Sequence, residues 1–143
     1  MIEIRHPRAS DFALIRQLLI DANLPVDDFT PEHLAFIASD DEQPFAAIGC
    51  ERMGDTWLLR SLVVAEEHRS RGLGARLVAA LEADAREQRV GEIWLLTIDA
   101  DGFFGSLGYR RRERDEAPEA IRGTAEFAEL CPASAVLMSR PLD

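Results

Sequence analysis

The chain has 143 residues, of which 26 are Asp or Glu and 16 are Lys or Arg, so its formal net charge is −10. This excess of negative charge argues against binding to nucleic acid or to an anionic membrane, because both depend on clustered basic side chains. The length and an apolar content of 47% are sufficient for one domain with one core, which we expect to span residues 1–143.

The sequence has no signal for a membrane, an export route or a metal. It contains no apolar run of about 18 residues, and Met1 to Arg8 lacks the basic-then-apolar order of a secretory signal. We therefore expect a cytoplasmic protein without a membrane segment. Cys50 and Cys131 are far apart and lack metal-type spacing, so we expect neither a disulfide framework nor a metal site.

The first half of the chain predicts a mostly antiparallel sheet. Ile2–Arg5 is expected to form a strand, and apolar residues at helical spacing from Phe12 to Ala22 predict a helix. Thr30-Pro31-Glu32 is expected to cap a short helix running to Ala35, and the flexible stretch between the two helices is expected to border a binding site. Turn residues then separate three predicted strands: Phe36–Ser39, Phe45–Arg52 and Trp57–Val64.

The second half predicts a strand, helix, strand crossover followed by short elements. One helical face follows residue 72, formed by Leu73, Leu77, Ala80, Leu81 and Ala85. The next apolar strand, Ile93–Ile98, is expected to lie parallel to Trp57–Val64 through a right-handed connection. The remaining predicted elements are a short helix over 101–107, an edge strand over 109–114, helical turns over 118–130 and a final strand over 135–140.

The segment Arg60–Ala75 reads as an apolar strand, a tight basic loop and a helix start. Backbone N–H groups at a helix N-terminus have no intrahelical partner, and together with the helix dipole they form an anion site. Gly72 and Gly74 allow close approach of the backbone, and Arg69 and Arg71 add positive charge. The segment therefore predicts a site for a pyrophosphate.

Three elements in order carry a resemblance to a known family: Ser61-Leu62-Val63-Val64, Arg69-Ser70-Arg71-Gly72-Leu73-Gly74, and the segment from Thr97 to Tyr109 with its Phe-x-x-Leu-Gly-Tyr ending. Together they resemble the GNAT family of acyl-CoA-dependent N-acyltransferases over roughly the whole chain. The resemblance implies an α/β fold with a mixed, mainly antiparallel sheet, flanked by helices and splayed at the acyl-CoA site.

The resemblance also implies acetyl-CoA as co-substrate and a position for it. The pantetheine is expected along the strand Leu62, Val63 and Val64, with a backbone N–H near Val64 polarising the thioester carbonyl. The pyrophosphate is expected at the loop and helix start, and two aromatic residues of the third element are expected beside the cofactor. These further cofactor residues are Arg69, Ser70, Arg71, Gly72, Leu73, Gly74, Ala75, Phe103 and Phe104.

The expected acid and base of the family are displaced in this chain. Many relatives carry a Tyr at the position of Phe104, so Ser106 or water is left to protonate the leaving group, and Tyr109 is expected to be packed. The strand Trp57–Val64 has no carboxylate, which makes Glu51 on the neighbouring strand the nearest candidate base. A thiol with a pKa of about 8.5 leaves readily as thiolate, so a strong general acid is dispensable.

Arg60 lies within an apolar strand, where a guanidinium needs a carboxylate, a phosphate or an open cleft. Two readings stay open: it binds an anionic substrate, or it forms a salt bridge to one of the many acidic residues. With Thr97, it is assigned to acceptor binding, and the favoured acceptor is a small-molecule amine of amino-acid-like or anionic character. The tail contains Arg114 through Pro118, Ile121, Thr124, Glu126, Phe127 and Cys131-Pro132-Ala133-Ser134-Ala135. With these residues it resembles a branch of the family associated with arsenic resistance, which suggests a toxic amino-acid analogue as acceptor.

Two further functions remain open from the sequence. One is acetylation of a protein N-terminus or lysine, because the acidic chain attracts basic peptides. The other is a weakly catalytic acyl-CoA sensor, favoured by Phe104 and the missing strand carboxylate, with a thiol-based sensing role for Cys50 and Cys131 as a weaker form. The acceptor, a homodimer and the role of the tail from Pro118 to Ser134 are left undecided.

Overall fold

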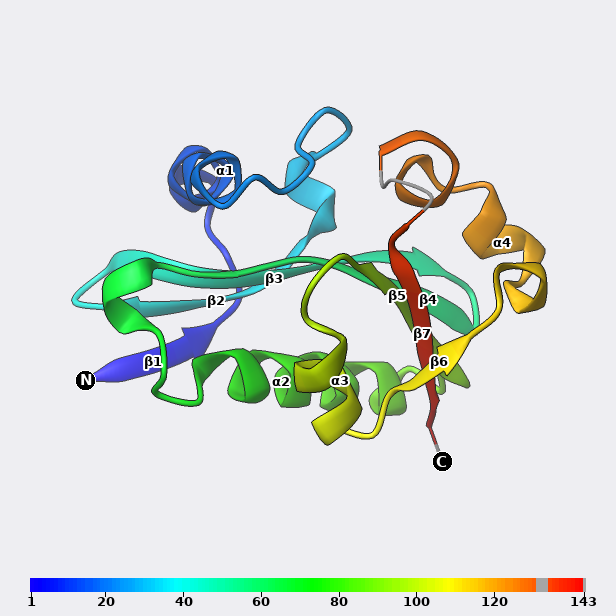
Figure 1. The fold of residues 1–143 in the computed structure, drawn as a ribbon. Helices are drawn as coiled ribbons and strands as arrows, with labels where there is room; N and C mark the ends of the chain where they lie inside the picture. The colour runs from blue at the N-terminus through cyan, green and yellow to red at the C-terminus, as the bar shows by residue number, and fades with distance from the viewer. Residues whose placement is uncertain (131–133, 143) are drawn as a thin grey trace.

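A seven-stranded sheet of order β1-β2-β3-β4-β5-β7-β6 forms the centre of the computed structural model, which describes residues 1–130 and 134–142 (Figure 1). In these ranges β4 and β5 form the one parallel pair, and the other neighbours are antiparallel. The predicted mixed, mainly antiparallel α/β fold is confirmed. The strands are β1 (Ile2–Arg5), β2 (Leu34–Asp40), β3 (Gln43–Met53), β4 (Thr56–Val64), β5 (Glu92–Thr97), β6 (Arg110–Arg112) and β7 (Val136–Pro141).

Helices cover both faces of the sheet. Figure 1 shows α1 (Phe12–Asp21) and α4 (Glu119–Arg122) on one face, and α2 (Leu73–Glu87) and α3 (Asp101–Ser106) on the other. Buried apolar residues of α2 pack against β2, β3 and β4, whereas those of α1 pack on the opposite side of the same strands. In the parts of the chain that are described, no helix is long and apolar enough to cross a membrane.

The segment predicted as a helix from Thr30 to Ala35 is different in the structure. It forms a single 3₁₀ turn, Pro31–His33, and β2 begins immediately afterwards at Leu34. The capping prediction was wrong beyond one turn, because Leu34 and Ala35 are buried and Leu34 pairs with Gly49 of β3. Burial and ladder hydrogen bonds therefore outweigh the local capping signal.

The buried face of α2 contains four of the five predicted residues, Leu73, Leu77, Leu81 and Ala85. Ala80 is half-buried, while Val78 and Glu82 are buried. Glu82 tolerates burial because its carboxylate accepts hydrogen bonds from Tyr109 Oη at 3.0 Å and from Arg140 Nη1 at 2.9 Å. Two partners distant in sequence thus allow a carboxylate on the buried side of α2.

Candidate functional site

The parallel pairing of β4 with β5 ends after three residues, and a cavity opens beyond that point. Thr56–Leu58 pair with Glu92–Trp94, and the described residues of both strands then separate. The cavity has a volume of about 460 Å³, which is within the range of ligand sites. It is lined by residues from the segment after α1, both strands, α3 and the tail: Ala22, Asn23, Leu24, Pro25, Leu59, Arg60, Ser61, Leu62, Leu95, Leu96, Thr97, Ile98, Asp99, Ala100, Phe103, Phe104 and Glu126. The predicted splay of the sheet is therefore present.

A β-bulge in β4 borders the cavity. The register with β3 shifts so that Ser61 and Leu62 lie opposite Ile48 alone, and Ser61 has a φ of 56°. A bulge leaves backbone groups without a ladder partner, and Leu62 lines the cavity. Val63 and Val64 are not among the lining residues, and the Val64 carbonyl accepts a hydrogen bond from Arg69 Nε at 3.0 Å. The part of β4 that lines the cavity thus ends at Leu62, two residues before the predicted Val64.

The glycine loop leads directly into the N-terminus of α2. Gly72 is the N-cap, with a φ of 74°, and no side chain caps this end of the helix. Ser70 also has a positive φ, of 68°. The first N–H groups of α2, at Leu73 to Ala75, follow these two positive-φ residues and the exposed Arg71, and they form the electropositive end of the helix. This local geometry fits a bound pyrophosphate.

Phe103 joins this helix end to the cavity. A Cβ added at Gly74 would lie 3.2 Å from Phe103 Cζ, so the ring covers the first turn of α2, and Phe103 is also a lining residue. Phe104 lines the cavity from α3 and packs edge-on against Tyr109, with ring centroids 5.7 Å apart. These two aromatic residues and Leu62 are therefore brought together around one space.

Thr97 and Ser106, two other residues of the segment from Thr97 to Tyr109, differ in whether they reach the cavity. Thr97 lines the cavity, and its Oγ1 accepts a hydrogen bond from the Ala100 N–H at 3.0 Å. Ser106 is exposed on α3 and its hydroxyl donates to the Phe103 carbonyl at 2.6 Å, so the structure does not bring it to the cavity. Tyr109 is packed, as predicted: burial and Glu82 raise the pKa of its hydroxyl far above the ordinary value.

Arg60 is fully buried within an ion-pair cluster. Its Nη1 and Nη2 atoms donate to the two carboxylate oxygens of Asp28, each at 2.7 Å, and Nη1 also donates to Glu51 Oε2 at 3.0 Å. Nε donates to Ser61 Oγ at 3.1 Å. These hydrogen bonds hold the pKa of Asp28 below its ordinary value. Of the two readings of Arg60, the salt bridge is the one present, and its guanidinium is occupied by carboxylates.

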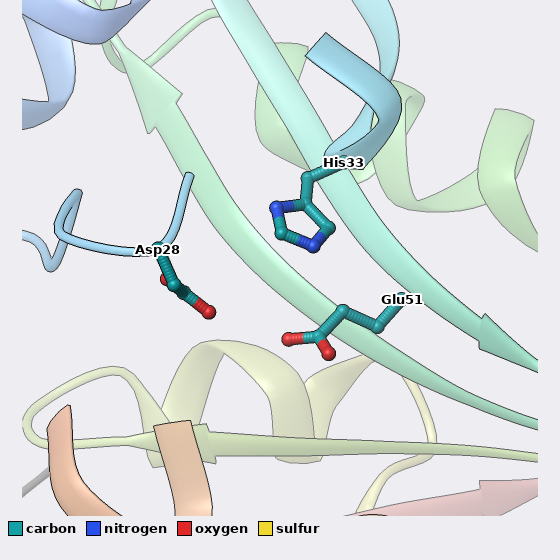
Figure 2. A group of neighbouring side chains, drawn as sticks. All are labelled: Asp28, His33 and Glu51. Atoms are coloured by element: carbon teal, nitrogen blue, oxygen red, sulfur yellow. The ribbon is translucent and has the colours of Figure 1, made fainter. Parts of the chain in front are cut away.

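Figure 2 shows Asp28, His33 and Glu51 converging from three segments, with ligand atoms within 4.8 Å of one another. His33 comes from the 3₁₀ turn, where its Nδ1 accepts the Thr30 N–H at 3.2 Å. Because Arg60 already supplies the positive charge between Asp28 and Glu51, the group fits an ion-pair cluster better than a cation site. Glu51, the predicted base, therefore serves Arg60 and does not line the cavity.

Glu126 is the residue at the site whose role the sequence did not reveal. It begins the π-helical turn Glu126–Leu130, is 4% exposed and lines the cavity. Its Oε2 lies 3.3 Å from Arg60 Nη2. Burial raises its pKa to about 7 against the lowering effect of Arg60. The residues next to Glu126, Thr124-Ala125 and Phe127, do not indicate that its carboxylate is buried. Only the fold brings Glu126 close to Arg60, which is 66 positions earlier in the chain.

Cys50 is buried in the core, and burial raises the pKa of its thiol to about 12. A thiol with this pKa is a poor nucleophile and ligand at neutral pH. Cys131 lies outside the described residues. The burial of Cys50 thus gives no support to a thiol-based sensor at that position.

The family model described as "Acetyltransferase (GNAT) family" matches residues 5–109. This match covers most of the chain and agrees with the splayed sheet and the glycine loop. The chain therefore belongs to the GNAT acetyltransferase family, as its sequence motifs predicted.

One curated relative and two solved structures are similar to this chain. Over 63 residues the chain is 41% identical to an uncharacterized N-acetyltransferase of Chlorobaculum tepidum, a match covering 44% of this chain and 40% of that protein. The N-acetylglutamate synthase of Neisseria gonorrhoeae, solved with coenzyme A and N-acetyl-glutamate, superposes with a TM-score of 0.85 at 18% identity, over 100% of this chain and 35% of that chain. A GNAT acetyltransferase of Staphylococcus aureus gives 0.83 at 17% identity, over the full length of both. The match thus spans about two fifths of the curated relative, and this chain about a third of the synthase.

Proposed function

We propose that the chain transfers an acetyl group from acetyl-CoA to the amine of a small molecule. The observation that carries this proposal is the cavity between the separated β4 and β5, whose lining residue Phe103 also contacts the first turn of α2 at Gly74. Membership of the GNAT family and the coenzyme A complex of the N. gonorrhoeae synthase support acetyl-CoA as the donor.

The loop before α2, strand β4 and the cavity would hold the pyrophosphate, the pantetheine and the acetyl group of acetyl-CoA, in that order. Its pyrophosphate would lie against the backbone of Arg69–Ala75, and its pantetheine along β4. The acetyl group would then lie in the cavity beside the bulge, where the backbone at Leu62 is the group that would polarise the carbonyl. We infer that Leu62 has the role the sequence assigned to Val64.

The transfer needs little acid catalysis from the protein. An unprotonated amine nitrogen attacks the thioester carbonyl carbon, a C–N bond forms, and the C–S bond breaks with its electron pair on sulfur. The thiolate then takes the surplus proton of the nitrogen, giving the N-acetyl product and free CoA. Because a thiol has a pKa of about 8.5, Phe104 in place of an acidic side chain does not prevent this step.

The acceptor is proposed to be a small molecule because the cavity is lined on several sides. Ala22 to Pro25 and Glu126 border it opposite the strands and α3. An amino acid, or a toxic phosphinic or arsenic-containing analogue of one, is a finer proposal that rests on the resemblance of the tail. Among the described lining residues Arg60 is the one basic side chain, and it is occupied by Asp28 and Glu51.

A thiol-release screen tests the proposed function. Acetyl-CoA binding is measured by calorimetry, and free CoA is measured with a thiol reagent in the presence of amino acids, amino-acid amides, the phosphinic and arsenic-containing analogues, and basic peptides. Release with a small amine supports the proposal, and release with peptides alone favours a protein acetyltransferase. Binding of acetyl-CoA without release from any amine favours the sensor, and a protein that does not bind acetyl-CoA overturns the site.

A further inference from the structure

The tail places one buried carboxylate inside the acceptor end of the cavity. Glu126 is 4% exposed, yet it lines the same cavity as Leu62, Thr97 and Phe104. Buried carboxylates need a partner, because the loss of hydration is expensive. The charged groups around the Glu126 carboxylate therefore affect which ligands the cavity can bind.

Glu126 is held in place by the packing of its own segment. Ile121 of α4 is fully buried against Leu58 of β4. The buried Thr124 donates its hydroxyl to the Ile121 carbonyl at 2.7 Å and accepts the Phe127 N–H at 3.3 Å. The carboxylate thus extends from a seated turn, which favours a fixed position over a flexible surface role.

The charges around Glu126 do not balance. Arg60 is one cation, and it directs its close hydrogen bonds to Asp28 and Glu51, at 2.7 to 3.0 Å, whereas Glu126 receives the longest ion pair, at 3.3 Å. His33 lies beside Asp28 and Glu51, and Arg60 is the one basic side chain among the described residues that line the cavity. Three carboxylates share the one guanidinium of Arg60, and the negative charge of Glu126 is the least neutralised of the three. Glu126 is therefore the carboxylate that would attract a positively charged ligand in the cavity.

We propose that Glu126 binds the acceptor as an ammonium ion and takes its proton, so that the cavity selects primary amines recognised by positive charge. This inference rests on the proposed acetyl transfer. In the proton step, R–NH₃⁺ and the Glu126 carboxylate become R–NH₂ and the carboxylic acid. The freed nitrogen lone pair attacks the thioester, and Glu126 returns its proton to solvent before the next turnover.

The environment suits a base at neutral pH. Burial raises the pKa of Glu126 to about 7, Arg60 opposes the rise, and Asp28 and Glu51 add to it. A general base is most effective when its pKa lies near the working pH. An ammonium ion beside the carboxylate favours its charged form, so binding and deprotonation use the same group.

This assignment replaces two expectations from the sequence. Glu51 is not a lining residue and its Oε2 accepts from Arg60, so it acts as a positioning residue for the guanidinium. Arg60, in turn, is not free to bind an anionic acceptor. A carboxylate on the acceptor would instead meet Glu126 and the lining Asp99, and like charges repel. This inference therefore favours an amine without an anionic group over the amino acid or analogue that the tail resemblance suggests.

The first experiment compares Glu126→Gln with Glu119→Gln, an exposed position on the same tail. With the amine that the wild type acetylates fastest, we expect Glu126→Gln to lower kcat/KM about 100-fold or more, while acetyl-CoA affinity by calorimetry stays within about twofold. We expect Glu119→Gln to match the wild type. Wild-type kcat/KM should rise with pH through about 7, and this limb should be absent in Glu126→Gln.

Glu126→Asp keeps the titratable group one methylene shorter and guards against a folding defect. We expect it to retain the pH limb with intermediate activity. A second arm compares amino acids with their C-terminal amides in the thiol-release assay. The wild type is expected to prefer the amide about tenfold, since about 1.4 kcal/mol of charge discrimination gives that ratio, and Glu126→Gln should lose the preference.

The outcomes separate the two proposals. Thiol release that Glu126→Gln leaves unchanged, or a preference for the free amino acid over its amide, overturns the role of Glu126 and leaves the acetyl transfer intact. Loss of activity in Glu126→Asp together with loss of its pH limb also overturns the base role, because the titratable group is still present. Absence of release with every amine overturns the proposed function, and this inference with it.

Discussion

The two ends of the cavity are built in different ways. The proposed cofactor end uses backbone: the bulge at Ser61 borders the cavity, and the left-handed Gly72 and the first turn of α2 lie beyond Phe103. The proposed acceptor end is lined by the charged side chains of Arg60 and Glu126, and Arg60 also pairs with Asp28 and Glu51, which do not line the cavity. The first depends on local conformation and tolerates changes of side chain, whereas the second depends on a charge balance that any one substitution disturbs.

Removing the positive charge of Arg60 should have the largest effect on stability among the variants considered. Arg60→Met leaves Asp28, Glu51 and Glu126 facing one another without compensation, and we expect a loss of about 3–5 kcal/mol in the free energy of unfolding at pH 8. Urea denaturation measures this loss. Arg111→Met is the control, because Arg111 is exposed and pairs with Asp101 at the surface at 2.9 Å; its loss should stay below about 1 kcal/mol. Equal losses of stability in the two variants would show that the buried Arg60 cluster is no more important for folding than a surface ion pair.

The charge balance also predicts how stability depends on pH. Glu126 has a pKa of about 7 in the folded protein against an ordinary value of 4.5, so the folded state holds more protons than the unfolded state between these two pH values. Stability relative to Glu126→Gln should therefore fall as pH rises from 4.5 to 7 and level off above, by on the order of 2–3 kcal/mol. Denaturation at several pH values measures the difference. A constant difference, like that expected for Glu119→Gln, would contradict the raised pKa.

At the cofactor end a charge change should alter affinity and leave stability nearly unchanged. Arg71→Glu places negative charge beside the proposed pyrophosphate site, and we expect acetyl-CoA affinity to fall about tenfold at low salt, with less effect as salt screens the charge. Calorimetry measures this. Arg89→Glu makes the same charge change beyond the other end of α2, at an exposed residue. Equal losses would indicate a general field and not a local site.

The smallest expected effect tests the contact that joins α2 to the cavity. In Gly74→Ala the new Cβ would lie 3.2 Å from Phe103 Cζ, so the ring must shift by a few tenths of an ångström. We expect acetyl-CoA affinity to fall about threefold, while the better helix propensity of Ala raises stability by up to about 1 kcal/mol. Gly102→Ala is the control, because a Cβ there meets nothing within 4 Å. Unchanged affinity in Gly74→Ala would remove Phe103 from the cofactor site.

The order of elements and the glycine loop could be predicted because their signals are local. Apolar runs bounded by turn residues predicted β3 and β4, helical spacing predicted α1 and α2, and the loop with its two glycines predicted the helix N-terminus that the structure contains. The exceptions are informative. Thr30 to Ala35 became strand after one turn because Leu34 pairs with Gly49, and Ser106 turned to the surface of α3.

The sequence by itself therefore determined the family, the sheet and the backbone end of the cavity, because strands, turns and helix starts are specified by neighbouring residues. Only the tertiary structure decided the acceptor end. The partners of Arg60 come from positions 28, 51 and 126, and nothing local distinguishes these carboxylates among 26 acidic residues. Electrostatic interactions depend on distance and burial, and both are set by how the tail and the segment after α1 pack over the sheet.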